Sequence, residues 1–472
     1  MNQAERKKIL LISDDIRQSS GVSNVSRDII INTAHHYNWV QMGGAINHPD
    51  LGKAFDISED INKEAGITDA SVKIIPVNGY GDPSILRQIL DIEKPDALFI
   101  ITDPRYFIWL FQIENEIRRK IPIIYYNIWD EYPAPLYNSS YYESCDALFG
   151  ISKQTVNINK LVLGDKSENK IIKYIPHGIP TKYFRPIDEG DKDFAVFKKQ
   201  LTGGKEYDFV MFFNSRNMRR KQIPDTLLAF KLFLDTLPKE KADKCLFILH
   251  TQPVDDNGTD LMAVIEYLFG AKNENVKISN QRLHPSQLNY FYNIADIQIL
   301  LSSNEGWGLS LTEALVTGTP IIANVTGGMQ DQMRFNDNEG RWLEFSAELP
   351  SNHNGTYGGC GEWAFPVFPS NKSMQGSPVT PYIWDSRCRA EDAADQILKA
   401  YEIGREGLKK LGKEGMDWAL GDEAGFSAEI MGKRMIEGID ELFATWKPRE
   451  KFEFINANEG YRERKYNHNL VY

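Results

Sequence analysis

Short apolar runs rich in β-branched residues alternate with helical patterns along the chain from Ile9 to Val325. Such alternation is typical of parallel sheets whose strands are joined by helical crossovers. In the first half, the runs predict strands at residues 9–13, 39–42, 72–77, 97–102, 123–128 and 147–151. Helical patterns fall between them, for example at residues 22–34, 83–92 and 107–120. We therefore expect a first doubly wound α/β sheet.

The pattern is lost between Phe184 and Glu206, a stretch that is rich in charge and contains Pro186 and three glycines. Glycine, proline and charge in such density are typical of a linker. A second series of apolar runs then predicts strands at residues 209–213, 246–250, 276–278, 297–301 and 320–324. The expected fold class is therefore α/β, with two doubly wound sheets in tandem.

Regular periodicity disappears again between Arg341 and Arg389, where Gly, Pro, Trp and Phe accumulate in the phrase GTYGGCGEWAFPVFPS. Structureless loops of this length are unusual unless they are functional, so we predict an ordered insertion or a lid. Helical patterns resume at residues 391–411 and 424–446, and the tail either crosses the first domain or stays mobile. The predicted parts are a first domain (1–185), a linker (186–206), a second domain (207–446) with an insertion (341–389), and a tail (447–472).

The composition fits this division into two domains. The chain has 472 residues, 42% of them hydrophobic and 25% charged, which are ordinary values for folded globular proteins. One hydrophobic core rarely supports such a length, so two domains of roughly 200 residues each are expected. The first apolar run is short and has no small-residue cleavage site after it, so we predict no signal peptide. No window approaches the ~18 apolar residues that span a bilayer, so no integral membrane association is expected.

Cysteine usage and net charge indicate the cellular compartment and the kinds of partner to expect. The four cysteines lie far apart without a CxxC spacing, and we interpret them as free thiols in a reducing compartment. A cytoplasmic location is expected, where sequons such as Asn138 and Asn257 meet no glycosylation machinery. The net charge of −11 argues against a broad nonspecific nucleic-acid footprint, although a local basic groove stays open.

The most informative segment is residues 302–328, SSNEGWGLSLTEALVTGTPIIANVTGG, which follows a predicted strand and opens into a helix. Gly306 and Gly308 leave backbone amides bare before the helix N-terminus, where the dipole favours a phosphate or a hydroxyl-rich ligand. Glu305 lies in the strand-to-helix turn, at the carboxyl edge where ligands of such sheets bind. Glu313 lies two turns into the helix, and carboxylates suit vicinal diols such as those of ribose. The alternative is a helix cap and a surface glutamate.

This segment resembles the donor site of retaining glycosyltransferases with the GT-B fold, above all the family-four (glycosyl transferases group 1) enzymes. Their pattern is E-G-[FW]-G, then E-A, then G-T-P and a glycine pair, and the glutamates of its E-x7-E spacing match Glu305 and Glu313. The resemblance implies two Rossmann-like domains that face a central cleft, with the acceptor side first and the nucleotide-sugar donor side second. It implies that Glu305 contacts sugar hydroxyls and Glu313 the ribose. The implied donor-binding residues also include Gly306, Trp307, Gly308 and Leu309.

A basic phrase, NSRNMRRK at residues 214–221, follows the first strand of the second domain. Arg216 and Lys221 resemble the G-R…K pair with which the family grips the donor diphosphate, although Ser215 replaces the usual glycine. Fixed cations stabilise the charge that develops on a leaving diphosphate, so we expect Arg216, Lys221 and Glu305 to be catalytic. Arg220 is a further donor-binding candidate, and which cation pairs with Lys221 is open. The alternative is a solvated basic turn.

The first domain carries a weaker pattern near its first strand. Gly21, in the phrase SSGV, resembles the glycine loop that faces the diphosphate from the other domain, and an ordinary tight turn is the alternative. Asp14 and Asp15, just before it, either bind an acceptor hydroxyl or cap the turn.

The phrase NIWDEYP departs from the family. Many relatives carry a His-Asp pair there, whereas this chain keeps Asp130 and has Trp129 near the histidine position. We take Trp129 and Asp130 as acceptor-side candidates. Trp129, Tyr132 and Tyr126 form either a stacking face or core. His177, in the phrase IPHGIP, is interpreted as structural.

No metal site is expected, because the eight histidines are scattered and no calcium-loop pattern occurs. The resemblance implies no bound cofactor, with the nucleoside diphosphate sugar as co-substrate. The phrases G-x-G-x-x-G and G-x-x-x-x-G-K-[ST] are absent, which argues against dehydrogenases and P-loop proteins.

The functional hypothesis is retaining transfer of a sugar to a hydroxyl acceptor. The phrases DQMRF and GSPVTPYI look similar to glycosyltransferases of large tailed bacteriophages, some of which decorate hydroxymethylated DNA bases in the host cytoplasm. A glycan, a lipid-linked or a small-molecule acceptor is the alternative, and a sugar phosphorylase and a noncatalytic nucleotide-sugar-binding protein also stay open. The sugar, the nucleotide and the oligomeric state are not predicted. A DNA groove would need cations at Arg118, Arg119, Lys120, Arg462, Arg464 and Lys465.

Overall fold

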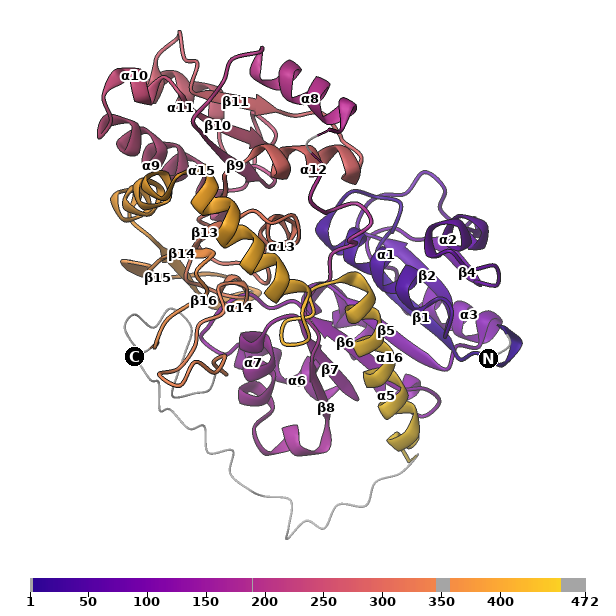
Figure 1. Cartoon of the computed structure of the whole chain (residues 1–472). Coiled ribbons are helices and arrows are strands. Elements are labelled where there is room, and N and C mark those ends of the chain that lie inside the picture. Colours follow the sequence, from indigo (N-terminus) through magenta and orange to yellow (C-terminus); the bar gives the residue numbers. More distant parts are fainter. Residues whose placement is uncertain (1–2, 189, 345–356, 451–472) are drawn as a thin grey trace.

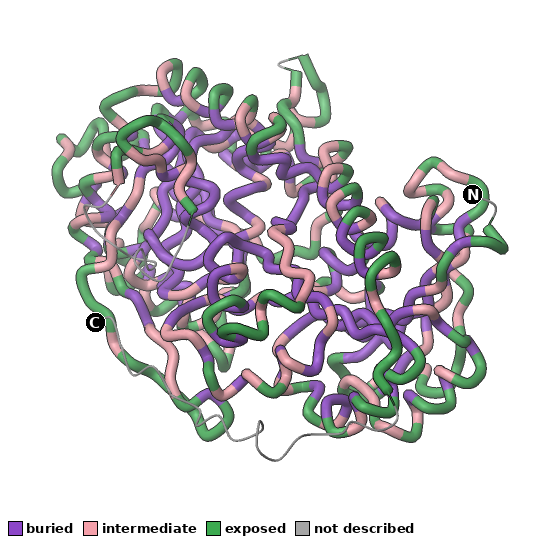
Figure 2. The backbone as a smooth tube through the Cα atoms, turned by 90° about the horizontal axis from the view of Figure 1, so that it is seen from below, coloured by how far each residue is buried: buried purple, intermediate pink, exposed green. Residues whose placement is uncertain are grey.

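The computed structural model describes residues 3–188, 190–344 and 357–450. Two mainly parallel sheets lie side by side, each with helices on both faces (Figure 1). The strands are mostly buried and the outer faces of the helices exposed, as Figure 2 shows. The predicted α/β fold with two doubly wound sheets is therefore confirmed.

The first sheet has eight strands in the order β3-β4-β2-β1-β5-β6-β7-β8. All neighbours pair in parallel except β3, which is antiparallel to β4. Strands β5, β6 and β7 are buried at every position because helices cover both faces, so they read as continuous apolar runs. The strands are β1 (Lys8–Asp14), β2 (Asn38–Gly44), β3 (Phe55–Asp56), β4 (Val72–Pro76), β5 (Ala97–Ile101), β6 (Ile123–Asn127), β7 (Ala147–Gly150) and β8 (Ile171–Tyr174).

Side-chain caps fix where several helices of the first half begin. Ser20, Asp82 and Ser152 each accept a hydrogen bond from a backbone amide of the first turn. The helices are α1 (Gly21–Thr33), α2 (Ser58–Ala65), α3 (Pro83–Glu93), α4 (Ile108–Phe111), α5 (Glu114–Ile117), α6 (Ser139–Glu143) and α7 (Lys153–Leu163), with 3-10 turns η1 (Gln3–Glu5), η2 (Pro104–Phe107), η3 (Leu136–Asn138) and η4 (Gly164–Asn169).

The second sheet has six parallel strands in the order β11-β10-β9-β12-β13-β14, and a separate antiparallel hairpin, β15–β16, follows it. In each sheet the strand order changes direction next to the first strand, between β1 and β5 in the first sheet and between β9 and β12 in the second. Ligands of such sheets bind at this switch point, at the carboxyl ends of the strands. The strands are β9 (Phe209–Asn214), β10 (Cys245–His250), β11 (Val276–Ser279), β12 (Ile297–Leu300), β13 (Ile321–Asn324), β14 (Ala364–Val367), β15 (Asn371–Ser377) and β16 (Thr380–Arg387).

Two long helices close the described chain. Helix α15 packs on α9 and α13 of the second half, whereas α16 returns to pack on α1 of the first half (Figure 1). The Tyr37 hydroxyl donates to Asp440 Oδ1 at 2.7 Å across that contact. The helices of this half are α8 (Lys192–Thr202), α9 (Ile223–Asp235), α10 (Lys239–Ala242), α11 (Leu261–Phe269), α12 (Pro285–Ile294), α13 (Leu309–Val316), α14 (Met329–Gln332), α15 (Ala390–Leu420) and α16 (Ala428–Thr445), with the 3-10 turn η5 (Arg219–Lys221).

The chain passes between the halves twice, and the two passages are hydrogen bonded to each other. The Ile179 amide donates to the Phe426 carbonyl at 2.9 Å, and the Ala428 amide donates to the Ile179 carbonyl at 3.0 Å. Gly178 fits this contact because a Cβ there would lie 2.3 Å from the Ser427 carbonyl oxygen.

Three segments have a different structure from the one that the sequence periodicity predicted. The stretch expected to be irregular, 184–206, contains α8, which Asp191 caps and whose Phe197 packs on Tyr290. The helix expected at 107–120 is broken into η2, α4 and α5, although no proline or glycine marks the breaks. The stretch at 341–389 is no simple loop: it holds β14, which pairs with β13, and the hairpin.

Candidate active site between the two sheets

The two motif segments of the second half meet at its switch point. Residues 214–221 follow β9 and residues 302–308 follow β12, which is the neighbouring strand. The Ser303 amide donates to the Arg220 carbonyl at 2.8 Å, and Arg220 Nη1 donates to the Asn304 carbonyl at 2.9 Å. The backbone therefore fixes both segments against each other.

Glu305 lies at the centre of a charge cluster in which Glu305 and Lys221 are buried and Arg220 is partly exposed. Its Oε2 atom accepts from Arg220 Nη1 at 2.9 Å, from Ser302 Oγ at 3.1 Å and from Lys221 Nζ. Burial acts to raise the pKa of Glu305, but the two cations outweigh it and hold that pKa at about 2. Glu305 is therefore a carboxylate at any physiological pH.

The pKa values of the two cations shift in opposite directions, although Glu305 acts to raise both. The Glu305 charge raises the pKa of Arg220, whereas burial lowers the pKa of Lys221 against the opposing pull of Glu305. Asp130 reaches the cluster from the first half: burial raises its pKa, and the Arg220 charge opposes that rise. The cluster therefore sets two cations against one carboxylate at the junction of the two halves.

Arg216 lies apart from this cluster. Its side chain is 60% exposed, and its Nε donates to Asp255 Oδ2 at 2.9 Å. The hydrogen bond from Arg216 lowers the pKa of Asp255 to about 2. In this structure the arginine beside Lys221 is therefore Arg220, which the sequence pattern named only as a further candidate.

Glycines let three loops approach closely at the cluster. Gly308, with φ of +90°, precedes α13 in a left-handed conformation. A Cβ on Gly306 would lie 2.7 Å from the Ile128 carbonyl oxygen of the first half. Gly327, with φ of +55°, is tighter, because its Cβ would lie 2.0 Å from the Glu305 carbonyl oxygen and 2.9 Å from that of Asp130. Only glycine fits at this junction of both halves.

Glu313 points from α13 back to the end of β9. Its Oε2 accepts from the Tyr292 hydroxyl and from Asn214 Nδ2 at 3.3 Å. Burial raises the pKa of Glu313 to about 7, and these two donors oppose the rise. Sequence reasoning did not assign Asn214 or Tyr292 to the site, because they lie far from Glu313 along the chain.

Trp307 anchors the loop that precedes α13, which we call the donor loop (residues 302–308) after its predicted role. Its indole is buried, donates from Nε1 to Thr312 Oγ1 at 2.9 Å and meets Phe426 edge to face at 5.0 Å. Leu309, the first residue of α13, lies opposite Gly21, where a Cβ would lie 3.7 Å from Leu309 Cδ1. The glycine loop of the first half therefore faces the N-terminus of α13, and its contact with a diphosphate stays a prediction.

Asp14 and Asp15 are both engaged within the first half. Asp14 accepts from Ser20 Oγ and from the Tyr80 hydroxyl at 2.7 Å. Asp15 is fully buried and forms a two-point ion pair with Arg17, at 3.0 Å from Nε and 2.7 Å from Nη2. These contacts favour the capping interpretation, and an acceptor role for either residue stays a prediction.

The three aromatic residues near Asp130 are all buried. Tyr126 is buried and donates from its hydroxyl to the Ile175 carbonyl at 2.7 Å, so it belongs to the core. Tyr132 is also buried, and its hydroxyl accepts from Asn157. Trp129 donates from Nε1 to the Glu131 carbonyl at 2.8 Å and lines a pocket together with Asp130.

His177 lies close beneath the site, between the rings of Tyr126 at 5.4 Å and Trp307 at 6.4 Å. Neither ring nitrogen has a hydrogen-bond partner among the described residues. Burial lowers the pKa of His177 to about 3, so the ring is neutral at physiological pH. This environment agrees with a packing role.

A buried carboxyl group also joins the two halves beside the site. Glu131 is fully buried, accepts from Thr326 Oγ1 of the second half and from the Tyr132 amide at 2.9 Å, and burial raises its pKa from 4.5 to about 7. The folded protein therefore holds this proton up to a higher pH than the unfolded chain does. Stability contributed by the protonated form is lost as the pH rises from about 4.5 through 7.

We expect the Glu131→Gln substitution to flatten the pH dependence of the thermal midpoint between pH 5 and pH 8. The amide keeps the shape and an acceptor but cannot ionise, which removes at most roughly 3 kcal/mol of pH-dependent free energy of unfolding. Thermal melts at closely spaced pH values measure it. Glu339→Gln, at an exposed position, is the control and should leave the curve unchanged. An unchanged curve for Glu131→Gln would contradict the raised pKa.

The structure also bears on metals and membranes. Within residues 3–188, 190–344 and 357–450, no group of three His, Cys, Asp or Glu side chains is arranged to hold a metal ion. No helix in the described part of the chain is long and apolar enough to cross a membrane. That the reaction needs no cofactor stays a prediction.

Comparison with known proteins relates the second half to one family. Residues 198–348 match the family Glycosyl transferases group 1, and this range contains η5, β12 and α13 with the whole charge cluster of the second half. The prediction of a glycosyltransferase domain is thereby confirmed. No curated protein sequence matches the chain.

Solved structures are similar over almost the whole chain. The Anabaena protein HepE in complex with UDP and glucose is 13% identical, with a TM-score of 0.64 over 93% of this chain and 100% of that one. Sucrose-phosphate synthase from Thermosynechococcus elongatus is 16% identical, with a TM-score of 0.64 over 93% and 100%. The α,α-trehalose 6-phosphate synthase from Burkholderia multivorans is 11% identical, with a TM-score of 0.62 over 94% and 99%. The two-sheet fold is therefore that of GT-B glycosyltransferases.

Proposed function

We propose that this protein, with its group 1 glycosyltransferase domain, moves a sugar from a nucleoside diphosphate sugar to a hydroxyl acceptor with retention of the anomeric configuration. The observation that carries the proposal is the charge cluster of Glu305, Arg220 and Lys221 at the N-terminus of α13, opposite Asp130. It offers fixed positive charge and bare amides where a diphosphate would lie.

The chemistry follows from the position of the cations. The bond between the anomeric carbon and the diphosphate oxygen breaks, and charge develops on the leaving group. Arg220 and Lys221 stabilise that charge more strongly in the transition state than in the bound donor, which lowers the barrier. A new bond forms between the anomeric carbon and the acceptor oxygen. The acceptor proton passes to the leaving phosphate on the same face of the sugar, which preserves the configuration.

The remaining donor contacts are assigned by their surroundings. Glu305 would accept from sugar hydroxyls when the donor draws Arg220 and Lys221 toward its phosphates. Glu313, held by Tyr292 and Asn214, would contact the ribose. Gly21 and Leu309 lie next to each other where the two halves meet and would border the diphosphate. UDP-sugars are the first donors to test, since HepE was crystallised with UDP and glucose.

The location and the acceptor are also part of the proposal. All four cysteines are free thiols, which is typical of the cytoplasm. Arg118, which a DNA groove would need, is buried in ion pairs with Asp146 at 2.7 Å and Glu114 at 3.0 Å. Arg462, Arg464 and Lys465 lie outside the described residues. We therefore favour an acceptor other than DNA and keep hydroxymethylated DNA, as a phage enzyme would use, as an arm of the test.

The test combines binding and turnover. Purified protein is screened by thermal shift against UDP-, GDP-, ADP- and dTDP-sugars, and release of the nucleoside diphosphate is followed with sugars, lipid-linked glycans and hydroxymethylated DNA as acceptors. We expect one nucleotide to raise the thermal midpoint and to be released slowly even into water. Proton NMR of the product should show the anomeric coupling of the donor. Binding without any release would favour a noncatalytic nucleotide-sugar-binding protein.

A further inference from the structure

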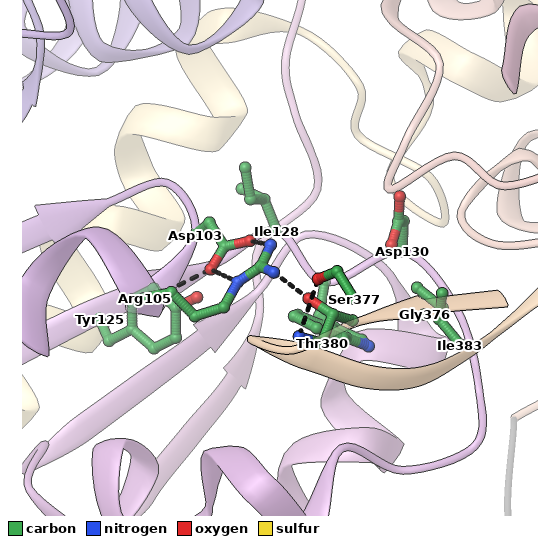
Figure 3. Close-up of a pocket in the computed structure, with 10 residues that line it drawn as sticks. Asp103, Arg105, Tyr125, Ile128, Asp130, Gly376, Ser377, Thr380 and Ile383 are labelled. Atoms are coloured by element: carbon green, nitrogen blue, oxygen red, sulfur yellow. Dashed lines mark hydrogen bonds and ion pairs between the residues drawn. The ribbon is translucent and has the colours of Figure 1, made fainter. Parts of the chain in front are cut away.

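A pocket of about 350 Å³ lies between the first half and the hairpin β15–β16 (Figure 3). The first half contributes residues of β6 and the loops that follow β5 and β6, and the hairpin contributes the end of β15 and part of β16. The lining residues are Asp103, Arg105, Tyr125, Ile128, Trp129, Asp130, Gly376, Ser377, Thr380 and Ile383.

The hairpin is fastened to both halves. The Trp384 amide donates to the Tyr132 carbonyl at 2.8 Å, and the Tyr137 hydroxyl donates to the Tyr382 carbonyl at 2.9 Å. On the other side, the Ser386 amide donates to the Ser303 carbonyl at 2.9 Å, two residues before Glu305. The hairpin therefore spans from the donor loop to the first half and forms a fixed wall.

The floor of the pocket is held in a strained conformation. Thr102, at the end of β5, has φ of +110°, which is rare for a β-branched residue. Strain of this kind persists where a function requires it. The next residue, Asp103, forms an ion pair with Arg105, which also donates to Thr380 of the hairpin (Figure 3). The strained turn thus places the Asp103 carboxylate in the pocket, and Arg105 bonds this turn to the hairpin.

We propose that this pocket is the acceptor site, that it takes one neutral, hydroxyl-rich unit such as a free sugar or a polyol, and that the hairpin selects for it. The proposal rests on the proposed function. Asp130 lines the pocket and also lies within electrostatic reach of Arg220 and Glu305, so a bound hydroxyl would face the donor cluster.

Charge and shape define the class of acceptor. Asp103 and Asp130 are acceptors for hydroxyl groups, while the guanidinium of Arg105 is already engaged by Asp103 and Thr380. Asp103 and Arg105 offset each other's charge, and Arg105 is the one cation among the lining residues, so the lining offers a phosphate no unpaired cation, which disfavours phosphorylated acceptors and nucleic acid. Tyr125 and Trp129 back the pocket as almost fully buried aromatic residues. The volume is at the low end for ligand pockets, which suits a single small unit.

The central test narrows the pocket from the hairpin side. Ser377 is exposed to solvent yet lines the pocket, so Ser377→Trp fills space there without burying the new side chain in a core. We expect the acceptor KM to rise at least about tenfold, with donor KM and slow donor hydrolysis unchanged. Val379→Trp, at a 58% exposed position two residues on, is the matched control and should behave as wild type. Wild-type acceptor kinetics in Ser377→Trp would overturn the proposal.

A second variant tests the charge of the pocket. Asp103→Asn removes one carboxylate and releases Arg105, so we expect use of sugar phosphates to rise relative to the free sugars. Both variants are assayed with UDP-glucose, or the donor found in the screen, against free monosaccharides, polyols, sugar phosphates and hydroxymethylated DNA by mass spectrometry. A wild-type protein that hydrolyses donor but transfers only to DNA or sugar phosphates would overturn the acceptor assignment. A wild-type protein that releases no nucleoside diphosphate would instead refute the proposed function.

Discussion

Replacing Lys221 with alanine is expected to lower kcat for sugar transfer by a factor of about 10² to 10³ while the protein stays folded. The Nζ atom is buried beside Glu305 and supplies charge where the diphosphate leaves, and removal of one such stabilising group typically costs this much. Donor hydrolysis and transfer should fall together, since both break the same bond. Single-turnover measurements of nucleoside diphosphate release, with circular dichroism to check folding, test it.

The two nearby arginines provide the matched comparison. Arg220 contacts Glu305 directly, whereas Arg216 is mostly exposed and pairs with Asp255, so Arg220→Ala should reduce kcat far more than Arg216→Ala. Arg216 is the residue that the family pattern assigns to the diphosphate. A large loss in Arg216→Ala with little effect of Arg220→Ala would show that donor binding turns Arg216 inward, and would contradict our assignment.

Replacing Gly327 with alanine is expected to lower transfer by more than tenfold and to lower the thermal midpoint by several degrees. The added Cβ would lie 2.0 Å from the Glu305 carbonyl oxygen and 2.9 Å from that of Asp130, so the loops of both halves must move apart. The left-handed conformation adds about 1–2 kcal/mol for any residue other than glycine. Donor KM and kcat should both worsen because Glu305 and Asp130 lose their relative placement.

Gly340→Ala separates backbone strain from the clash at Gly327. Gly340 has φ of +80° and open space around its Cβ position, so this variant bears the conformational cost alone. We expect its activity to equal that of wild type, with at most a small drop in thermal midpoint. Equal losses of activity in both variants would mean that the close approach of the three loops is not required.

The elements that sequence predicted best are those whose burial is uniform. Strands such as β5 and β9 are buried along almost their whole length and read directly as apolar runs. Strand β8 was missed because all four of its residues are only half-buried, and β14 because it is short and contains Pro366. Helix α8 was missed because charged residues and flanking glycines surround its apolar stripe of Phe194, Phe197 and Leu201, which is only partly buried.

The sequence predicted only those parts of the site whose residues stand close together along the chain. The spacing of Glu305 and Glu313 and the basic run that ends at Lys221 stand in single phrases of the sequence. The partner of Arg216 is Asp255, which lies in another loop, so no spacing could show that this side chain turns away from the cluster. The pocket was missed for the same reason, because Asp103 and Thr380 meet only after the hairpin crosses to the first half.

The paired passages at Ile179 and Phe426 restrict how the two halves can move. A single flexible connection would let one half swivel about it in any direction. Here two chain segments run side by side and are bonded to each other, so twisting one half against the other would shear those bonds. Bending across the pair costs neither hydrogen bond. The paired passages therefore resist rotation of one half about the connection, and the hairpin, bonded to both Tyr132 and Ser303, resists separation of the two halves.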